Sequence, residues 1–308
     1  MKVQKIGLLA IILILYITPS GNLKQTKKIE PTDIYFKKDA HRAFESNSGY
    51  CDMNTLFYPK IQNGQAYLYN RKSDTVAFGP CRYIYYEDLN NKVFRFVDQN
   101  GLIGYASIMQ DRTVFILHNG QYSEATAMQD GSACVKDGEF YYYIDKNGIR
   151  FTKHDYVEAY PFSESQGFFA RVKMKDGHWA IIDKKENVIF DSFDSIEKLP
   201  YLTTYGAATK NDKVVLFSLE QFEDDSQPRI TSILDYIDIH ILGRDCLYAI
   251  VTSKDGKKGV ITIWNGEIFI PAEYVDIQFG DIDNTETFFF RCQKEDTTVD
   301  YFYMKGIW

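Results

Sequence analysis

The sequence predicts an all-β protein made of about seven β-hairpin repeats of ~37 residues. Three observations predict it: a turn dipeptide that recurs at a near-regular interval, strand-like arms on both sides of each turn, and a composition with 23 Tyr and 22 Phe, which favours strands. Repeats of this length stack as equivalent units. A β-propeller-like ring would remove the exposed sheet edges at the ends of the array, and an open β-solenoid satisfies the same repeats.

The clearest repeat runs from Gly167 to Ile196. Its first arm alternates, with Phe168, Ala170, Val172 and Met174 on one side, which indicates a strand with one buried face. Asp176-Gly177 follows and predicts a two-residue type I′ turn, because Asp-Gly tolerates positive φ angles. A second arm and a short third strand complete the unit, and Phe193 begins the next one.

The turn recurs along the chain in steps of 35 to 44 residues. Its copies are Asn63-Gly64, Asn100-Gly101, Asp137-Gly138, Asp176-Gly177, Asn211-Asp212, Asp255-Gly256 and Glu295-Asp296. A second glycine turn follows in two copies, at Gly148 and Gly266. An aromatic residue opens most units: Tyr83, Tyr122, Tyr156, Phe193, Tyr236 and Tyr274.

The segment from Lys254 to Ile277 contains a spaced motif made of Gly256, Lys257, Gly259, Ile261, Ile270-Pro271 and Tyr274. This motif resembles the bacterial WG (KWG) repeat. Lys175 to Asp183 is also similar, with Trp179 in the tryptophan position but Ala180 where the family has glycine. The resemblance covers about Gly49 to Trp308. It implies a repeat domain over residues 49–308, and it implies no chemistry.

The first twenty residues have the pattern of a signal peptide. Lys2 and Lys5 precede an apolar run from Ile6 to Ile17, and small residues precede a possible cut before Gly21. An uncleaved N-terminal anchor is the alternative. Residues 21–48 are polar and predict a spacer. We therefore expect an exported protein, either periplasmic, at the cell surface or secreted, that contacts a membrane only through a retained leader.

Charge and cysteine content exclude some classes of site. The net charge of −7 argues against nucleic-acid binding, which favours a basic surface. The five cysteines have no CxxC spacing, so a metal site is not expected. Cys134 and Cys292 sit at core positions of their repeats. Export permits a disulfide, and Cys51 and Cys81 are the candidate pair.

The sequence predicts no catalytic, cofactor-binding or metal-binding residue. The five histidines (His41, His118, His154, His178 and His240) lack ligand spacing. Asp281-x-Asp283-Asn284 lacks the glycine and the distal glutamate of a calcium loop, so a solvated turn is expected there. Glu223-Asp224-Asp225 predicts an insertion loop that could contact a partner.

These features favour an exported, non-enzymatic binding or scaffolding protein that contacts another protein at the bacterial envelope. The alternative is a carbohydrate-binding protein that uses exposed Tyr side chains with Trp179, Trp264 and Trp308. An enzyme whose site is assembled across repeats is the third reading. For Trp179 itself we expect core packing between two layers.

Overall fold

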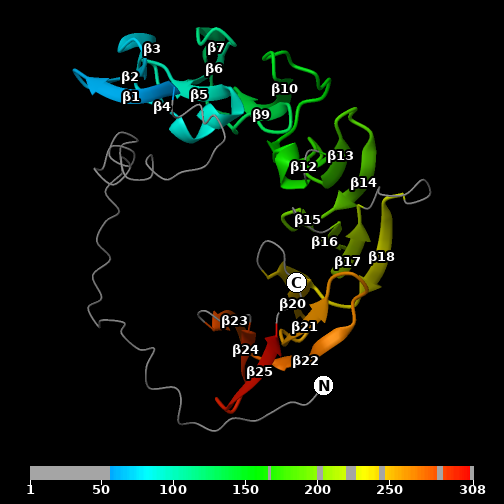
Figure 1. Cartoon of the computed structure of the whole chain (residues 1–308). Helices are drawn as coiled ribbons and strands as arrows, with labels where there is room; N and C mark the ends of the chain where they lie inside the picture. The colour runs from blue at the N-terminus through cyan, green and yellow to red at the C-terminus, as the bar shows by residue number, and fades with distance from the viewer. Residues whose placement is uncertain are drawn as a thin grey trace. The chain divides into compact units, whose positions relative to one another are not determined.

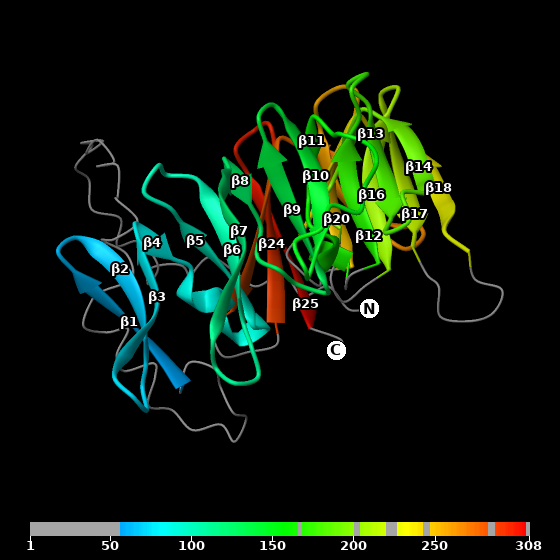
Figure 2. The ribbon, with the colours of Figure 1, turned by 90° about the horizontal axis from the view of Figure 1, so that it is seen from above.

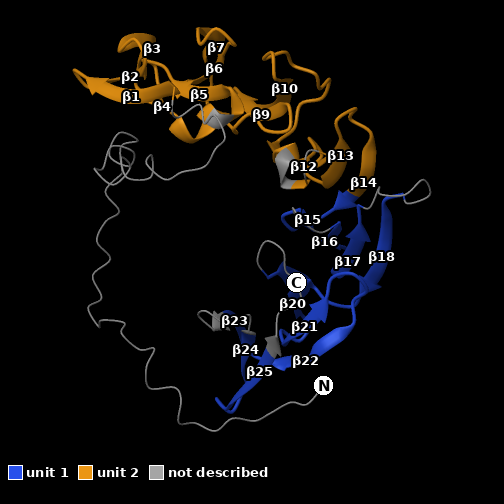
Figure 3. Ribbon diagram, in the orientation of Figure 1, with its two compact units in different colours: residues 1–24, 192–308 blue, residues 25–191 orange. Residues whose placement is uncertain are grey.

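The computed structural model describes residues 56–165, 168–199, 204–219, 227–242, 247–282 and 287–305. The predicted leader, the spacer, Cys51, Cys246, Glu223-Asp224-Asp225 and Trp308 lie outside these residues. The chain divides into two compact units, Gln25–Asp191 and Met1–Lys24 with Ser192–Trp308 (Figure 3). Each unit is described by itself.

Four antiparallel sheets follow one another up to β14, which runs across the unit boundary (Figure 2). Sheet A holds β1 (Phe57–Gln62), β2 (Gln65–Asn70) and β3 (Thr75–Cys81). Sheet B holds β4 (Tyr83–Ile84), β5 (Val93–Val97), β6 (Ile103–Ile108) and β7 (Val114–Tyr122). Sheet C holds β8 (Glu124–Ala125), β9 (Ser132–Asp137) and β10 (Phe140–Asp145). Sheet D holds β11 (Glu158–Ala159), β12 (Phe169–Lys173), β13 (Trp179–Asp183) and β14 (Val188–Phe193).

Three further sheets belong to the other unit (Figure 1). Sheet E holds β15 (Ser195–Ile196), β16 (Tyr205–Lys210), β17 (Lys213–Ser218) and β18 (Arg229–Leu234). Sheet F holds β19 (Asp238–Ile241), β20 (Tyr248–Thr252), β21 (Lys258–Thr262) and β22 (Ile268–Tyr274). Sheet G holds β23 (Asp276–Ile282), β24 (Thr287–Gln293) and β25 (Val299–Lys305). Two described 3₁₀ helices, η3 (Tyr86–Asn91) and η4 (Phe162–Ser165), lie in connections of the unit Gln25–Asp191.

The predicted fold class is confirmed: the chain is all-β, and each of the seven predicted repeats forms one sheet. Within a sheet the strands pair in chain order, as an antiparallel meander, which is the topology of a β-propeller blade. The described elements include no α-helix. Whether the array is a closed ring or an open stack stays a prediction, because it depends on how the two units are placed.

The recurrent turn joins two neighbouring strands in each repeat, but the predicted type I′ geometry is wrong at several copies. At Asp176-Gly177 the loop has three residues: Gly177 N–H bonds Met174 O at 2.9 Å, and only Gly177 has positive φ (92°). This is a type I turn followed by a left-handed glycine. At Asp137-Gly138 the strands pair Asp137 with Phe140, so Gly138-Glu139 forms the turn and Gly138 (φ 63°) is its first residue. The true type I′ turns are Asn63-Gly64 and Asn211-Asp212, where both residues have positive φ. The register of the strands decides the turn type, and the dipeptide alone does not.

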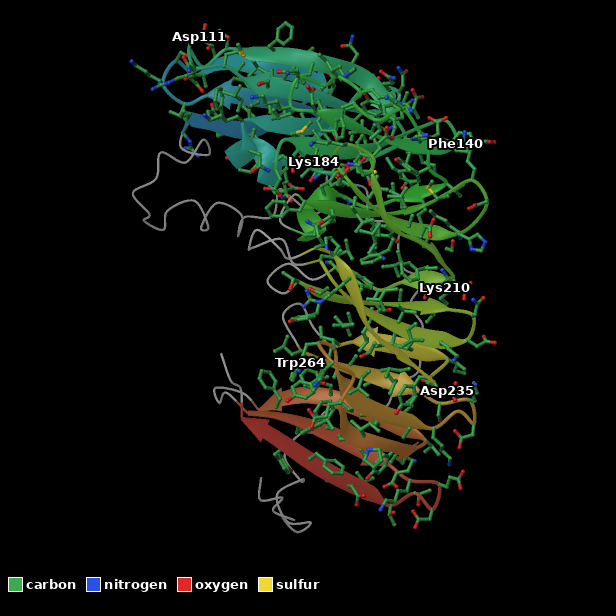
Figure 4. All side chains as sticks on the ribbon, turned by 90° about the vertical axis from the view of Figure 1, so that its right-hand side faces the viewer. Asp111, Phe140, Lys184, Lys210, Asp235 and Trp264 are labelled. Carbon is green, nitrogen blue, oxygen red and sulfur yellow. The ribbon has the colours of Figure 1, made fainter. Side chains whose placement is uncertain are left out.

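The recurrent turn and the turn between the third and fourth strands lie at opposite ends of the sheets. Phe140 follows a turn between second and third strands, whereas Lys184 lies in the turn between β13 and β14, and Figure 4 shows them on opposite sides. In the other unit, Lys210 and Trp264 are separated in the same way (Figure 4). The predicted second glycine turns are confirmed, since Gly148 and Gly266 have φ of 79° and 77°.

The central strands bury both faces, which corrects the prediction of one buried face. Ala170 and Val172 are fully buried as expected, but Phe169 on the other side of β12 is also buried, and Phe168 is 51% exposed. Consecutive buried residues also fill β13, where Ala180, Ile181 and Ile182 are at most 1% exposed. A strand with packed side chains on both sides loses the period-2 signal.

Tyrosine hydroxyls connect successive sheets in the unit Gln25–Asp191. Tyr105 of β6 donates to Thr126 O, just after β8, at 2.6 Å. Tyr143 of β10 makes the same bond to Tyr160 O, just after β11, at 2.7 Å. Both rings are fully buried, so each hydroxyl satisfies a carbonyl that would otherwise lose a hydrogen bond on burial. The aromatic residues that open each unit are buried in five cases: Tyr83, Tyr122, Tyr156, Phe193 and Tyr274.

In two repeats a glycine lies three residues after the turn glycine, at Gly104 and Gly259, and its presence has a steric cause. A Cβ on Gly104 of β6 would lie 2.5 Å from His118 O, and one on Gly259 of β21 would lie 2.8 Å from Ala272 N and Ile270 O. In both sheets the fourth strand has a register shift at this point. The bulge brings its backbone against the third strand, and only glycine leaves room for it.

Candidate functional site

A buried carboxylate joins sheet D to the connection that precedes it. Glu186 lies in the turn between β13 and β14, and its side chain is 8% exposed. It accepts hydrogen bonds from Lys153 N (2.7 Å), His154 N (3.1 Å) and the Tyr156 hydroxyl (2.9 Å). His154 Nδ1 lies 3.3 Å from the same carboxylate. Among the described residues, His154 is the histidine that lies beside an almost fully buried carboxylate. The carboxylate is occupied by backbone amides, which indicates a structural clamp.

A second buried charge is equally satisfied. Asp88, 1% exposed, pairs with Arg95 through Nε–Oδ2 at 2.6 Å and Nη2–Oδ1 at 3.0 Å. Arg95 also donates to Ala125 O at 2.9 Å, and its guanidinium lies 4.0 Å from the Tyr85 ring centroid. With Nε, Nη1 and Nη2 of the guanidinium all donating, the pair fixes η3 and β5 to the next sheet.

The remaining predicted residues do not gather into one site. His118 is partly buried, bonds Gly148 O and packs on Tyr122 at 5.6 Å, while His178 and His240 are exposed. Asp281 lies at the end of β23, and Asp283 and Asn284, which complete the expected solvated turn, are outside the described residues. Across the described ranges, no group of three or more His, Cys, Asp or Glu side chains could hold a metal ion. In the same ranges, no helix has the length and apolar character needed to cross a membrane.

The prediction that Cys134 and Cys292 are buried core residues is confirmed, since they are 2% and 0% exposed. Cys81 is a buried free thiol that bonds Ala66 O at 3.5 Å and Tyr83 O at 3.4 Å. Its candidate partner Cys51 lies outside the described residues.

Trp179 does not occupy a fully buried core position, contrary to the expectation of packing between two layers. It is partly buried, its ring lies 6.0 Å from Tyr160, and Lys173 Nζ is 5.8 Å from its centroid. Trp264 is also partly buried and packs on Tyr248 at 6.4 Å. Both tryptophans sit near strand ends, where the layers cover only part of a large ring.

Sheet A carries an aromatic and amide surface that sequence reasoning missed. One face of β1 and β2 packs into the core through Phe57, Ala66 and Leu68. The cross-strand pairs on the opposite face are Tyr58 with Tyr69, Lys60 with Tyr67, and Gln62 with Gln65. We call these six residues the Tyr face. Its members are partly or fully exposed except Tyr69, which is 7% exposed.

Side-chain contacts order the Tyr face. Its rings lie 5.5 Å (Tyr58 to Tyr69) and 6.5 Å (Tyr67 to Tyr69) apart, and Lys60 Nζ is 4.9 Å from the Tyr69 centroid. Gln62 Nε2 donates to the Tyr69 hydroxyl at 2.8 Å, and Tyr67 donates to Gln65 Oε1 at 3.2 Å. The Asp74 carboxylate accepts from the Tyr58 hydroxyl and raises the pKa of that phenol. Rings held in place lose little conformational entropy on binding, which suits them to recognition. The alternation of Tyr, Lys and Gln along β1 is the sequence signal that could have identified this surface.

Comparisons with known proteins find solved structures of similar fold and assign no family to this chain. No family model matches the chain, and no curated protein matches it. Among solved structures, the C-terminal WD40 domain of Sif2 is 10% identical, with 69% of each chain covered and a TM-score of 0.35. Hsv2 of Kluyveromyces lactis is 9% identical over 83% of this chain and 96% of its own, with a TM-score of 0.36. BamB from Moraxella catarrhalis is 10% identical over 81% and 88%, with a TM-score of 0.34. At such low identities and TM-scores the likeness carries no functional argument, and the fold assignment rests on the sheets themselves.

Proposed function

We propose that this chain is an exported, non-enzymatic binding protein that presents a WG-like repeat scaffold to another protein at the bacterial envelope. The observation that supports the proposal is the Tyr face. One side of sheet A packs into the core and fixes the sheet. The other side, which is the Tyr face, presents tyrosine rings, two glutamines and a lysine to solvent. Tyrosine is enriched in protein interfaces because it joins a large apolar area to a polar tip.

The energy of such an interface would come from a few ordered aromatic side chains. Tyr58 and Tyr67 flank Tyr69 and are the accessible members of the cluster. Hot-spot residues of this kind each contribute about 2 kcal/mol or more when a partner covers them. The buried carboxylate and the buried ion pair, by contrast, are satisfied within the fold and leave no group to act on a substrate.

The test is a quantitative pull-down from the envelope fraction with wild-type protein and with the double variant Tyr58→Ala/Tyr67→Ala. We expect at least one protein to be retained by the wild type and to be lost with the variant. Phe115→Ala is the matched control, because Phe115 is 61% exposed on β7 of another sheet. Equal retention by all three proteins would contradict the assignment of the Tyr face.

Carbohydrate binding is the second candidate, and the partly exposed pair of Trp264 and Tyr248 supports it. Flat aromatic side chains beside polar groups stack on sugar rings. Binding of purified cell-wall polysaccharide to the wild type and to Trp264→Ala tests this candidate. A loss of binding that occurs with Trp264→Ala and not with the tyrosine variant would favour it.

A further inference from the structure

Among the described strands, sheet G ends on β25 (Val299–Lys305), whose outer edge pairs with no other described strand. In sheets B, D, E and F the third strand is followed by a paired fourth strand, namely β7, β14, β18 or β22. In sheet G the order is β23-β24-β25, so β25 is the outermost strand in the described part of the chain. No strand in the described ranges pairs with the backbone N–H and C=O groups along that edge, and an unpaired edge of this kind is a template for strand addition.

Most other long outer strands are protected against strand addition, and β25 is not. The outer strands β3, β7, β18 and β22 each pair with a register shift, and Pro80 and Pro271 lie in β3 and β22. Natural edges are blunted by such bulges and prolines. β25 pairs with β24 in unbroken register over seven residues and contains neither proline nor glycine. Its only charged residues are Asp300 and Lys305.

The centre of β25 is self-complementary. Tyr301-Phe302-Tyr303 reads identically in both directions, and Phe302 packs inward on Tyr274 at 6.2 Å. The two tyrosines share the opposite face, 6.5 Å apart, and Tyr303 is 43% exposed. An antiparallel pair related by a two-fold axis at Phe302 places each Tyr301 opposite Tyr303 of the other copy. Isologous pairing requires this kind of self-complementarity.

From the open edge, the missing edge protection and the palindromic centre, we infer that β25 pairs antiparallel with β25 of a second copy of this chain. Sheet G then continues across the two-fold axis into sheet G of the other copy. Cross-strand tyrosine pairs and the added backbone ladder hold the dimer. The contact is small, so the dimer is concentration-dependent.

Sedimentation velocity of the purified chain over a range of concentrations tests the inference. We expect a reversible dimer in the wild type. Tyr301→Lys/Tyr303→Lys sets two like-charge pairs across the axis and should weaken dimerisation about tenfold or more. Ile233→Lys, on the outer strand β18 at a residue that is 60% exposed, is the matched control and should leave dimerisation unchanged. A chain that stays monomeric, as it would if another segment of the same chain covered β25, overturns the inference.

A cross-linking experiment fixes the register and does not depend on the stability of the lysine variant. Chains carrying Tyr301→Cys and Tyr303→Cys are prepared with Cys51 and Cys246 replaced by serine, and the remaining cysteines are buried. Directly opposite residues in antiparallel strands have Cα atoms about 4.5–5.5 Å apart, within disulfide range. Mild oxidation of the mixture should therefore produce a disulfide dimer, and oxidation of either variant alone should not. Failure of the mixture to cross-link, or equal cross-linking of each variant alone, overturns the pairing.

Discussion

Glu186 couples folding to pH because its charged form is the one that the fold stabilises. Burial alone would raise its pKa, but hydrogen bonds from the amides of Lys153 and His154 and from the Tyr156 hydroxyl lower the pKa below the ordinary 4.5. A carboxylate with a depressed pKa in the folded state stabilises the protein above its unfolded pKa. That contribution is lost as pH falls through the folded pKa.

We expect Glu186→Gln to lower the free energy of unfolding at pH 7 by about 1–3 kcal/mol, because a charged acceptor is lost from a buried site. The wild type should lose stability as pH falls from about 5 to 3, and the variant should lose less over that interval. Denaturant unfolding at several pH values measures both effects. Glu139→Gln, in an exposed turn, is the control, and an equal pH dependence in Glu186→Gln and wild type would contradict the clamp.

The buried thiols should resist alkylation in the native protein. Burial raises the pKa of Cys81 to about 12 and that of Cys292 to about 12, and it also raises the pKa of Cys134. Since the thiolate is the reactive form, iodoacetamide at pH 8 should label these three positions only after denaturation. Peptide mapping by mass spectrometry measures the labelling, and rapid native labelling would contradict their burial. Recovery of unpaired Cys81 from the denatured, non-reduced sample would exclude the Cys51–Cys81 disulfide.

At the scale of the hairpin, substitutions of Gly256 and Gly259 should destabilise the fold for different reasons. Gly256 has φ of 80° and open space around its Cα, so Gly256→Ala should cost about 1 kcal/mol through backbone strain alone. Asn tolerates this backbone region, so Gly256→Asn should recover most of the loss.

Gly259 has no positive φ, and a Cβ there would lie 2.8 Å from two backbone atoms of the fourth strand. Gly259→Ala should therefore cost more than Gly256→Ala, about 2–3 kcal/mol, and Gly259→Asn should give no recovery. Thermal and denaturant unfolding of the four variants checks the contrast. Equal losses at the two positions would contradict the bulge as the cause of the repeated glycine.

The partial burial of Trp179 lowers the expected cost of removing it. A ring buried between layers would cost ~3–5 kcal/mol on truncation to alanine. Because Trp179 is only partly covered, we expect about 1–2 kcal/mol for Trp179→Ala. Phe94, which is 0% exposed in the core of sheet B, should show the full cost on Phe94→Ala. An equal loss of unfolding free energy in the two variants would show that Trp179 is a fully buried core residue.

At the scale of the whole molecule, the number of repeats could be predicted because a local signal, the recurrent turn, marks each of the seven sheets. An aromatic residue also opens six of the seven units. Turn type could not be predicted, because it depends on which residues pair across the hairpin, as Asp137 with Phe140 shows. The Tyr face was missed for a similar reason. Taken singly, Tyr58 and Tyr67 look in sequence like the fully buried Tyr105 and Tyr143, and the signal that distinguishes the surface is the alternation of Tyr58, Lys60 and Gln62 along β1.

The pattern of the first twenty residues predicts export, and a mass measurement on protein isolated from cells tests this prediction. The short apolar run after Lys2 and Lys5 should direct export and then be removed, so intact-mass measurement of the exported chain should give an N-terminus at Gly21. Leu13→Arg places a charge in the apolar run and should leave the chain unprocessed in the cytoplasm. Lys27→Glu, beyond the cut, is the control and should be exported normally. An exported chain that keeps residues 1–20 would identify the segment as an anchor, and the protein would then act at the membrane surface.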